Sequence, residues 1–130
     1  GTVRQYDVAD RDTIRTRIRQ IAEATAMAHE AKAEMEYIEG VDPLVNAEAQ
    51  AVLAGDAGEA VSGHVNREAP RVMGSEDFGD MLRVRPGAFV FIGNGDSADL
   101  HNPGYDFDDS IAPVGASWFA TLAETRMPLG

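Results

Sequence analysis

Apolar residues recur at helical spacing close to the N-terminus. The residues that follow one another at intervals of three and four are Ile14, Ile18, Ile21, Thr25 and Ala28. This spacing predicts a helix over about residues 11–29 with one buried face. Asp10 is suited to cap its N-terminus.

Alternation replaces the helical period in the next segment. Residues 31–38 place Ala31, Ala33, Met35 and Tyr37 on one side and mostly charged residues on the other, which predicts a strand with one buried face. Residues 2–7 predict a short strand before the helix. Strand, helix and strand in this order are typical of half of a small α/β sandwich.

The pattern changes after residue 45. Asn46 is suited to cap a short helix over 47–54 that Gly55 would end, and Ser75 to cap another helix that runs to about 83. The continuous apolar run 88–92 predicts a strand buried on both faces. A last helix over about 110–125 has an apolar face formed by Ile111, Val114, Gly115, Trp118, Phe119 and Leu122.

These patterns predict an α/β chain in two parts, residues 1–45 and residues 46–130. The first part supplies only two strands, and two strands are marginally stable alone. The second supplies one central strand that needs neighbours on both sides. We therefore expect both parts to be incomplete pieces of a longer protein.

Charge and composition exclude several classes of protein. The net charge is −11, which disfavours binding to nucleic acid or to anionic membranes because both require clustered Lys and Arg. The absence of cysteine excludes disulfide scaffolds and cysteine zinc sites. No signal peptide is visible at the N-terminus, and a cytoplasmic protein is expected.

His101 is the histidine with the most informative position. It lies in a polar loop between the predicted central strand and the last helix, where α/β proteins place their sites. A neutral imidazole there could bind zinc or a similar ion. Metal signatures usually show two ligands at fixed spacing, and His101 has no such partner. Sequence spacing alone therefore favours a structural role for His101, and a structural role is also favoured for His29 and His64.

The acidic residues also admit two interpretations. Glu76 and Asp77 fit the first turn of a helix, where carboxylates stabilise the helix dipole. A cluster formed by Asp106, Asp108 and Asp109 suggests a calcium loop but lacks the usual twelve-residue pattern. A turn and N-cap for the last helix is the favoured interpretation of that cluster.

Four motifs in order carry a resemblance to a known family. They are Gly1-Thr2-Val3-Arg4 before a basic helix, Met73-Gly74-Ser75-Glu76-Asp77-Phe78, Pro86-Gly87-Ala88-Phe89, and Leu100-His101-Asn102-Pro103 with the acidic residues that follow. Together they resemble the amidohydrolase branch of the aminoacylase and carboxypeptidase G clan, which includes hippurate hydrolases. The resemblance covers essentially the whole chain.

The resemblance implies a division of roles along the chain. Residues 1–45 would be the second half of a ferredoxin-like lid, or dimerisation, domain. Residues 46–130 would be the C-terminal part of a mainly parallel α/β catalytic domain. His101 matches the family's last metal ligand, and Glu76 and Asp77 match a motif near its active site. Arg4 and Asn46 are candidates to hold a substrate carboxylate.

The same resemblance predicts the chemistry of the intact enzyme. It would be a homodimer that uses two divalent ions (zinc, manganese or nickel) to hydrolyse the amide bond of N-acyl amino acids. The family's other metal ligands and its Glu-Glu pair, which contains the general base, are absent from this chain. We therefore expect this chain alone to be inactive and to bind no zinc tightly.

A second class of function remains open. The chain could be a non-catalytic, acidic binding or assembly module, with calcium in the loop 96–109 or with a surface that complements an N-terminal chain. A relative that keeps the fold only as a scaffold is a third alternative.

Overall fold

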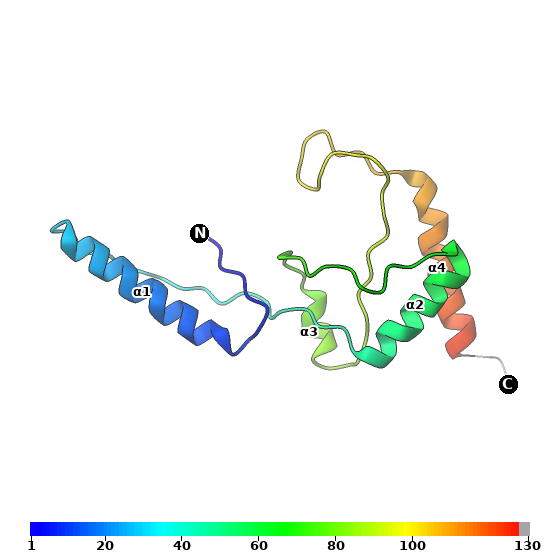
Figure 1. The fold of residues 1–130 in the computed structure, drawn as a ribbon, viewed down its shortest axis with the longest axis horizontal. Helices are drawn as coiled ribbons and strands as arrows, with labels where there is room; N and C mark the ends of the chain where they lie inside the picture. Colours follow the sequence, from blue (N-terminus) through cyan, green and yellow to red (C-terminus); the bar gives the residue numbers. More distant parts are fainter. Residues whose placement is uncertain (128–130) are drawn as a thin grey trace. The chain divides into compact units, whose positions relative to one another are not determined.

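The computed structural model describes residues 1–127, which form four α-helices and one short 3-10 helix (Figure 1). The elements are α1 (Asp10–Ala28), α2 (Glu48–Ser62), α3 (Phe78–Leu82), η1 (Asp109–Ile111) and α4 (Ala112–Arg126). No helix among residues 1–127 is long and apolar enough to cross a membrane.

The chain divides into two compact units, and each is described by itself. The first consists of Gly1–Val45 and Arg71–Val84, and the second of Asn46–Pro70 with the described part of Arg85–Gly130. The chain passes from the first unit to the second after Val45, and residues 71–84 return to the first unit, which the sequence pattern does not predict. The interpretation of the two parts as a lid half and a catalytic-domain tail stays a prediction.

The first unit contains α1 and the segment that returns along it. Helix α1 occupies almost the range predicted from the spacing of its isoleucines. Ile14, Ile18, Ala22 and Ala26 are half-buried on it, while Ile21 is exposed, so the contact face is rotated from the predicted one. The predicted alternation is confirmed for Ala33, Met35 and Tyr37, which are half-buried between exposed neighbours, but Ala31 on the same predicted face is exposed.

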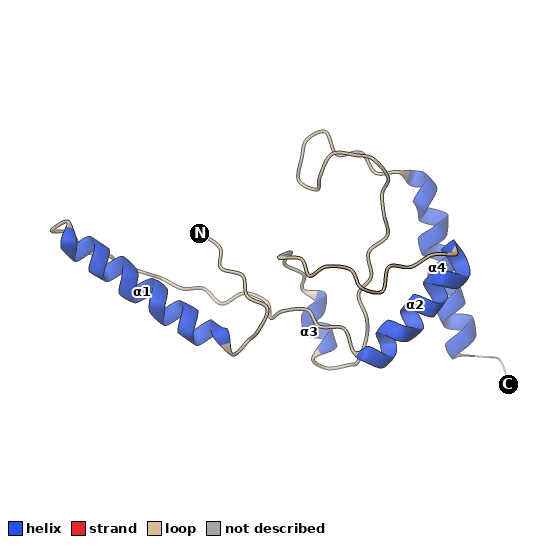
Figure 2. Ribbon diagram, viewed as in Figure 1, coloured by secondary structure: helices blue, strands red, loops and turns tan. Residues whose placement is uncertain are grey.

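The predicted strands do not appear as paired strands. Residues 2–7, 31–38 and 88–92 are neither helical nor part of a β-ladder, and residues 1–127 contain no strand (Figure 2). A strand requires a neighbour that accepts and donates its backbone hydrogen bonds, and none is assigned in this part of the chain. The α/β class and the ferredoxin-like lid therefore stay predictions.

The second unit is built on the packing of α2 against α4. Ala54 and Ala57 on α2 are each only 5% exposed, and the Trp118 indole N–H donates a hydrogen bond of 2.9 Å to the Ala54 carbonyl. Gly58 allows Val65 to lie close against α2, because a Cβ there would lie 2.9 Å from a Val65 methyl group, whereas it would meet the Trp118 ring at an ordinary contact distance of 3.9 Å. Small residues on one helix and one indole on the other thus form the core.

Helix α2 corrects two predictions. Gly55 does not end it: the glycine lies buried within the helix, which continues to Ser62 and ends at Gly63 with φ of 72°. Gly63 has the left-handed conformation that favours glycine at this position. The N-cap of α2 is Ala47 and not Asn46. The side chain of Asn46 bonds to the backbone of Phe89 instead.

Three further helix starts differ from prediction. Helix α1 begins at Asp10 without a side-chain cap, and Asp7 accepts a hydrogen bond from the Ala9 N–H. Helix α3 begins at Phe78 and has no side-chain cap, so Ser75 is not its N-cap. Helix α4 begins at Ala112 without a side-chain cap, and the acidic cluster caps the short η1 that directly precedes it, where the Asp108 carboxylate accepts a 2.9 Å bond from the Ser110 N–H.

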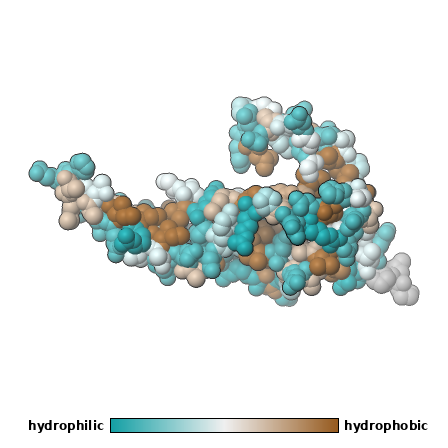
Figure 3. Space-filling view, viewed as in Figure 1, coloured by the Kyte–Doolittle hydropathy of each residue, from teal (hydrophilic) through white to brown (hydrophobic). Residues whose placement is uncertain are grey.

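The apolar face predicted for the last helix is only partly buried. Ile111, Gly115, Trp118 and Leu122 are half-buried, whereas Phe119 is 68% exposed. The run 88–92 was expected to be covered on both faces, yet Phe91 is 74% exposed. Figure 3 shows apolar atoms at the surface of both units. The described residues supply too few neighbours to cover these side chains.

Candidate functional site

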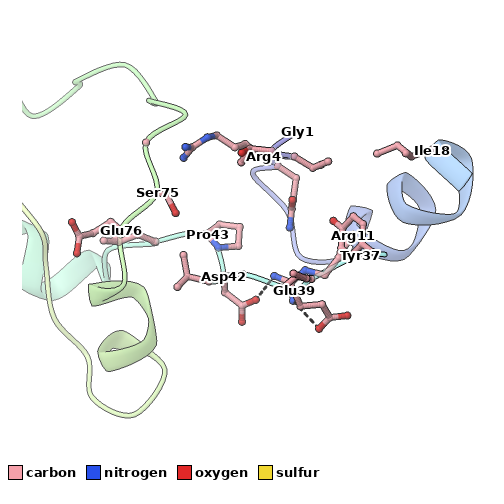
Figure 4. A pocket seen from close by; sticks show the side chains of 18 of the residues that line it. Gly1, Arg4, Arg11, Ile18, Tyr37, Glu39, Asp42, Pro43, Ser75 and Glu76 are labelled. Atoms are coloured by element: carbon pink, nitrogen blue, oxygen red, sulfur yellow. Dashed lines mark hydrogen bonds and ion pairs between the residues drawn. The ribbon is translucent and has the colours of Figure 1, made fainter. Parts of the chain in front are cut away.

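A cavity of about 620 Å³ lies in the first unit (Figure 4). Its walls come from three separate stretches of chain, residues 1–5, 35–44 and 74–76, together with two side chains of α1, Arg11 and Ile18. Arginines and carboxylates both line it. Figure 4 shows Arg4 extending toward the stretch that carries Ser75 and Glu76, and Arg11 directed toward Asp42.

Asp42 is shared by two arginines at the floor of this cavity. One carboxylate oxygen accepts a short hydrogen bond from Arg11, and the other lies 3.0 Å from Nη1 of Arg83. The side chains of Arg11 and Asp42 are each 17% exposed. The hydrogen bond to Asp42 raises the pKa of the Arg11 guanidinium, although partial burial lowers it. Asp42 therefore joins α1 to the residue that follows α3.

The Asp42→Asn substitution is expected to lower the midpoint of thermal unfolding. The amide preserves the shape but removes the charge that compensates two guanidinium groups, one of them largely shielded from water. The matched control is Asp12→Asn, since Asp12 pairs with Arg15 but is 81% exposed, and such pairs contribute little. Circular dichroism melts of the two variants should separate clearly. Equal midpoints would show that Asp42 contributes no more than a surface charge.

Glu76 and Asp77 occupy different surroundings within the same turn. Glu76 is half-buried, lines the cavity, and accepts a 3.1 Å hydrogen bond from the Phe78 N–H. Asp77 is exposed and precedes the first residue of α3. The carboxylate of Glu76 thus stabilises the start of α3 and is available at the cavity wall. A role for either residue in supporting catalysis stays a prediction.

His101 belongs to the second unit and lies at the tip of a turn. The Asn102 N–H donates to the Asp99 carbonyl at 3.1 Å, and the Asn102 side chain accepts from the Gly104 N–H at 2.8 Å. His101 is exposed and has φ of 67°. A left-handed conformation is uncommon for a residue with a side chain and is enriched at functional sites.

The base of the His101 loop is closed by Asn94. Its side chain donates to the Asp106 carbonyl and accepts from the Asp108 N–H, both at 2.8 Å. Ser97 bonds to both backbone groups of Asp106 at 3.1 Å. The Ser110 hydrogen bonds lower the pKa of Asp108, so the cap beside this base remains ionised. The loop therefore has a defined base and an exposed imidazole at its tip.

The described residues 1–127 bring no complete set of metal ligands together. Within residues 1–127, no three His, Cys, Asp or Glu side chains are arranged to hold one ion. Neither His101 nor the acidic loop 96–109 belongs to such a group of three. His29 follows the last residue of α1, and His64 follows α2 in an exposed loop. His101 can offer one ligand, and other chain segments would have to supply the rest.

The two candidates for holding a substrate carboxylate differ. Arg4 lines the cavity and makes no ion pair among residues 1–127, so its charge is available. Asn46 uses both its amide oxygen and its amide nitrogen on Phe89. Sequence patterns did not indicate Asp42 or Asn94, because the partners of both residues are distant in sequence.

The model of peptidase family M20/M25/M40 matches residues 2–125. An N-acetyl-L-cysteine deacetylase of Bacillus subtilis is 34% identical over 98% of this chain and 30% of its own length. A hippurate hydrolase of Campylobacter jejuni is 27% identical over 94% of this chain and 32% of its own length.

An N-acetyldiaminopimelate deacetylase of Leuconostoc mesenteroides is 30% identical over the whole of this chain and 34% of its own length. The chain thus spans about a third of the length of the curated relatives that it matches. No solved structure matches it significantly.

Proposed function

Because the chain belongs to peptidase family M20/M25/M40, we propose that it is part of a metal-dependent amidohydrolase that cleaves the amide bond of N-acyl amino acids. The observation that carries the proposal is the family match over residues 2–125, together with relatives named as deacetylases of N-acyl amino acids. A homodimeric, cytoplasmic enzyme without nucleic-acid or membrane partners belongs to the same proposal.

The residues of this chain would help to hold the metal ion and the substrate, and they would not supply the whole set of catalytic groups. His101 would present one imidazole to a metal ion that other segments also bind, and such an ion supplies a polarised carbonyl and an activated water. Arg4 would pair with a substrate carboxylate, because its guanidinium has no competing acid among residues 1–127. Glu76 would fix the turn beside that arginine.

The isolated chain is expected to hydrolyse no N-acyl amino acid and to retain no stoichiometric zinc after dialysis. A catalytic zinc needs about three protein ligands, and this chain offers one candidate. Product release from N-acetyl amino acids and zinc content by elemental analysis measure the two results. Stoichiometric zinc that disappears in His101→Ala would contradict the expectation, since it would show a complete site within the chain.

A chimera tests the function itself. In it, residues 2–125 replace the matched segment of the Bacillus subtilis N-acetyl-L-cysteine deacetylase, which supplies the remaining two thirds of the fold. We expect this chimera to bind zinc and to release acetate from at least one N-acetyl amino acid. A folded, zinc-loaded chimera without activity on any N-acyl amino acid would refute the proposed function.

A further inference from the structure

Helix α3 is fixed by contacts with the peptide of residues 42–44. One carboxylate oxygen of Asp42 lies 3.0 Å from Nη1 of Arg83, the residue that directly follows the helix. Gly79 within the helix is buried, and a Cβ there would lie 3.3 Å from the Asp42 carbonyl oxygen. The other carboxylate oxygen is bonded to Arg11, and the Asp42 side chain is only 17% exposed. Asp42 therefore determines where α3 lies in the first unit.

The start of the same helix holds the carboxylate of Glu76. Its Oε1 accepts a hydrogen bond of 3.1 Å from the N–H of Phe78, the first residue of α3. Because that N–H belongs to the helix, the carboxylate stays in place only while the helix does. The ion pair between Asp42 and Arg83 at the far end of α3 thus also fixes Glu76.

A cation without a partner lines the same cavity as Glu76. Arg4 forms no ion pair among residues 1–127, and Figure 4 shows its side chain extending toward the stretch that carries Ser75 and Glu76. Opposite charges that line one cavity attract each other. In the structure, the carboxylate of Glu76 is bonded to the start of α3 instead.

The stretch that carries Glu76 is also attached close to Arg4. The Arg71 guanidinium lies 5.6 Å from the centroid of the Tyr6 ring, within the range of a cation–π interaction, and Tyr6 is close to Arg4 in sequence. A stretch released from Asp42 would therefore remain attached at Arg71. Release of α3 would leave Glu76 close to Arg4 and without its bond to the helix.

We propose that Asp42 keeps Arg4 free to bind an anion, by holding α3 in the position where the helix retains Glu76. Asp42 is a positioning residue in this respect, because it acts through Arg83 and the helix. Without Asp42, Glu76 pairs with Arg4 and competes with an anionic ligand of the cavity. The consequence for catalysis rests on the proposed function, in which Arg4 pairs with the substrate carboxylate.

Two substrates that differ only in the carboxylate test this consequence in the chimera with the Bacillus subtilis deacetylase. In Asp42→Asn, we expect the KM for an N-acetyl amino acid to rise about three- to fivefold, the strength of an exposed ion pair. The KM for the corresponding N-acetyl amino acid amide should change less than about twofold, because that substrate has no carboxylate. Asp12→Asn, which removes an ion pair from an exposed aspartate, is the matched control and should leave both values unchanged. An unchanged KM for the N-acetyl amino acid in Asp42→Asn would overturn the proposal.

A second substitution separates competition by Glu76 from a general loss of structure. Glutamine cannot form the ion pair, so the double variant Asp42→Asn with Glu76→Gln should have the KM of Glu76→Gln alone. A rise in KM that persists in the double variant would overturn the proposal, because the effect of Asp42 would then not pass through Glu76. If Asp42→Asn does not fold, Arg83→Gln takes its place, since it keeps the pair between Arg11 and Asp42.

A disulfide reporter tests the same device in the 130-residue chain without any hydrolysis. The chain contains no cysteine, so Gln5→Cys with Ser75→Cys, both at the cavity, introduces a single pair and retains Arg4 and Glu76. We expect Arg83→Gln to speed disulfide formation at least about threefold, in keeping with the strength of an exposed ion pair. Further addition of Glu76→Gln should remove that increase.

The reporter also separates this proposal from the proposed function. Equal rates of disulfide formation with and without Arg83→Gln would overturn the proposal even if the chimera is active. The expected rates beside a folded chimera that hydrolyses nothing would support the proposal and contradict only the hydrolytic function.

Discussion

Replacing His101 by alanine in the chimera is expected to reduce the rate of N-acyl amino acid hydrolysis at least about 100-fold and to lower its zinc content. Loss of a group that only orients a metal ligand already costs about 10- to 100-fold, and the imidazole itself is the proposed ligand. The turn at residues 99–104 presents this ring to solvent on a loop closed at its base by Asn94. Product release and elemental analysis measure the two effects.

Two variants separate ligation from backbone conformation. His101→Asn retains a residue that tolerates φ near 67° but has no imidazole, so its activity should fall as far as that of His101→Ala. His64→Ala removes an exposed histidine from a different loop and should leave activity unchanged. Full activity in His101→Asn would show that position 101 serves the turn and not the metal.

Trp118→Ala is expected to destabilise the second unit by about 2–3 kcal/mol. A full loss of a buried Trp costs about 3–5 kcal/mol, and Trp118 is only half-buried. The substitution also leaves the Ala54 carbonyl without its indole donor. Because the buried apolar residues among 1–127 are Ala54 and Ala57, the indole provides a large share of the contact between α2 and α4. Urea titration followed by circular dichroism measures the loss.

Further variants separate the contribution of the Trp118 hydrogen bond from the contributions of the aromatic rings. Trp118→Phe keeps an aromatic ring but loses the bond to Ala54, and it should cost about 1 kcal/mol. Phe119→Ala changes a neighbouring ring that is 68% exposed and should cost less than Trp118→Ala. If Phe119→Ala were as damaging as Trp118→Ala, the α2–α4 contact would not depend on the indole.

Local periodicity predicted the elements whose evidence lies within a few residues. The isoleucine spacing gave the range of α1, and the alternation at 33, 35 and 37 gave the burial of the returning segment. Gly55 misled the prediction for α2 because a glycine ends a helix only when it adopts the left-handed conformation, which Gly63 adopts here. Sequence alone does not distinguish a terminal glycine from one that allows close packing.

Pairing between distant residues could not be predicted. Asn46 is a residue type that often caps helices, yet its side-chain amide bonds to the backbone of Phe89, 43 residues away. The network around Asp42 links α1 to Arg83 in the same way. For the candidate site, the chain itself indicates His101 and Glu76, but residues 1–127 bring no group of metal ligands together. The predicted strands likewise have no paired neighbour among these residues.

Gly79 sets how closely α3 packs on the peptide of residues 42–44. A Cβ on this residue would lie 3.3 Å from the Asp42 carbonyl oxygen and 3.4 Å from the Leu44 Cα, so α3 lies directly on the backbone of residues 42–44. Arg83, which follows α3, also pairs with Asp42, so the short helix contacts this peptide at two points. A larger residue at position 79 would therefore displace the helix whose first N–H bonds to Glu76.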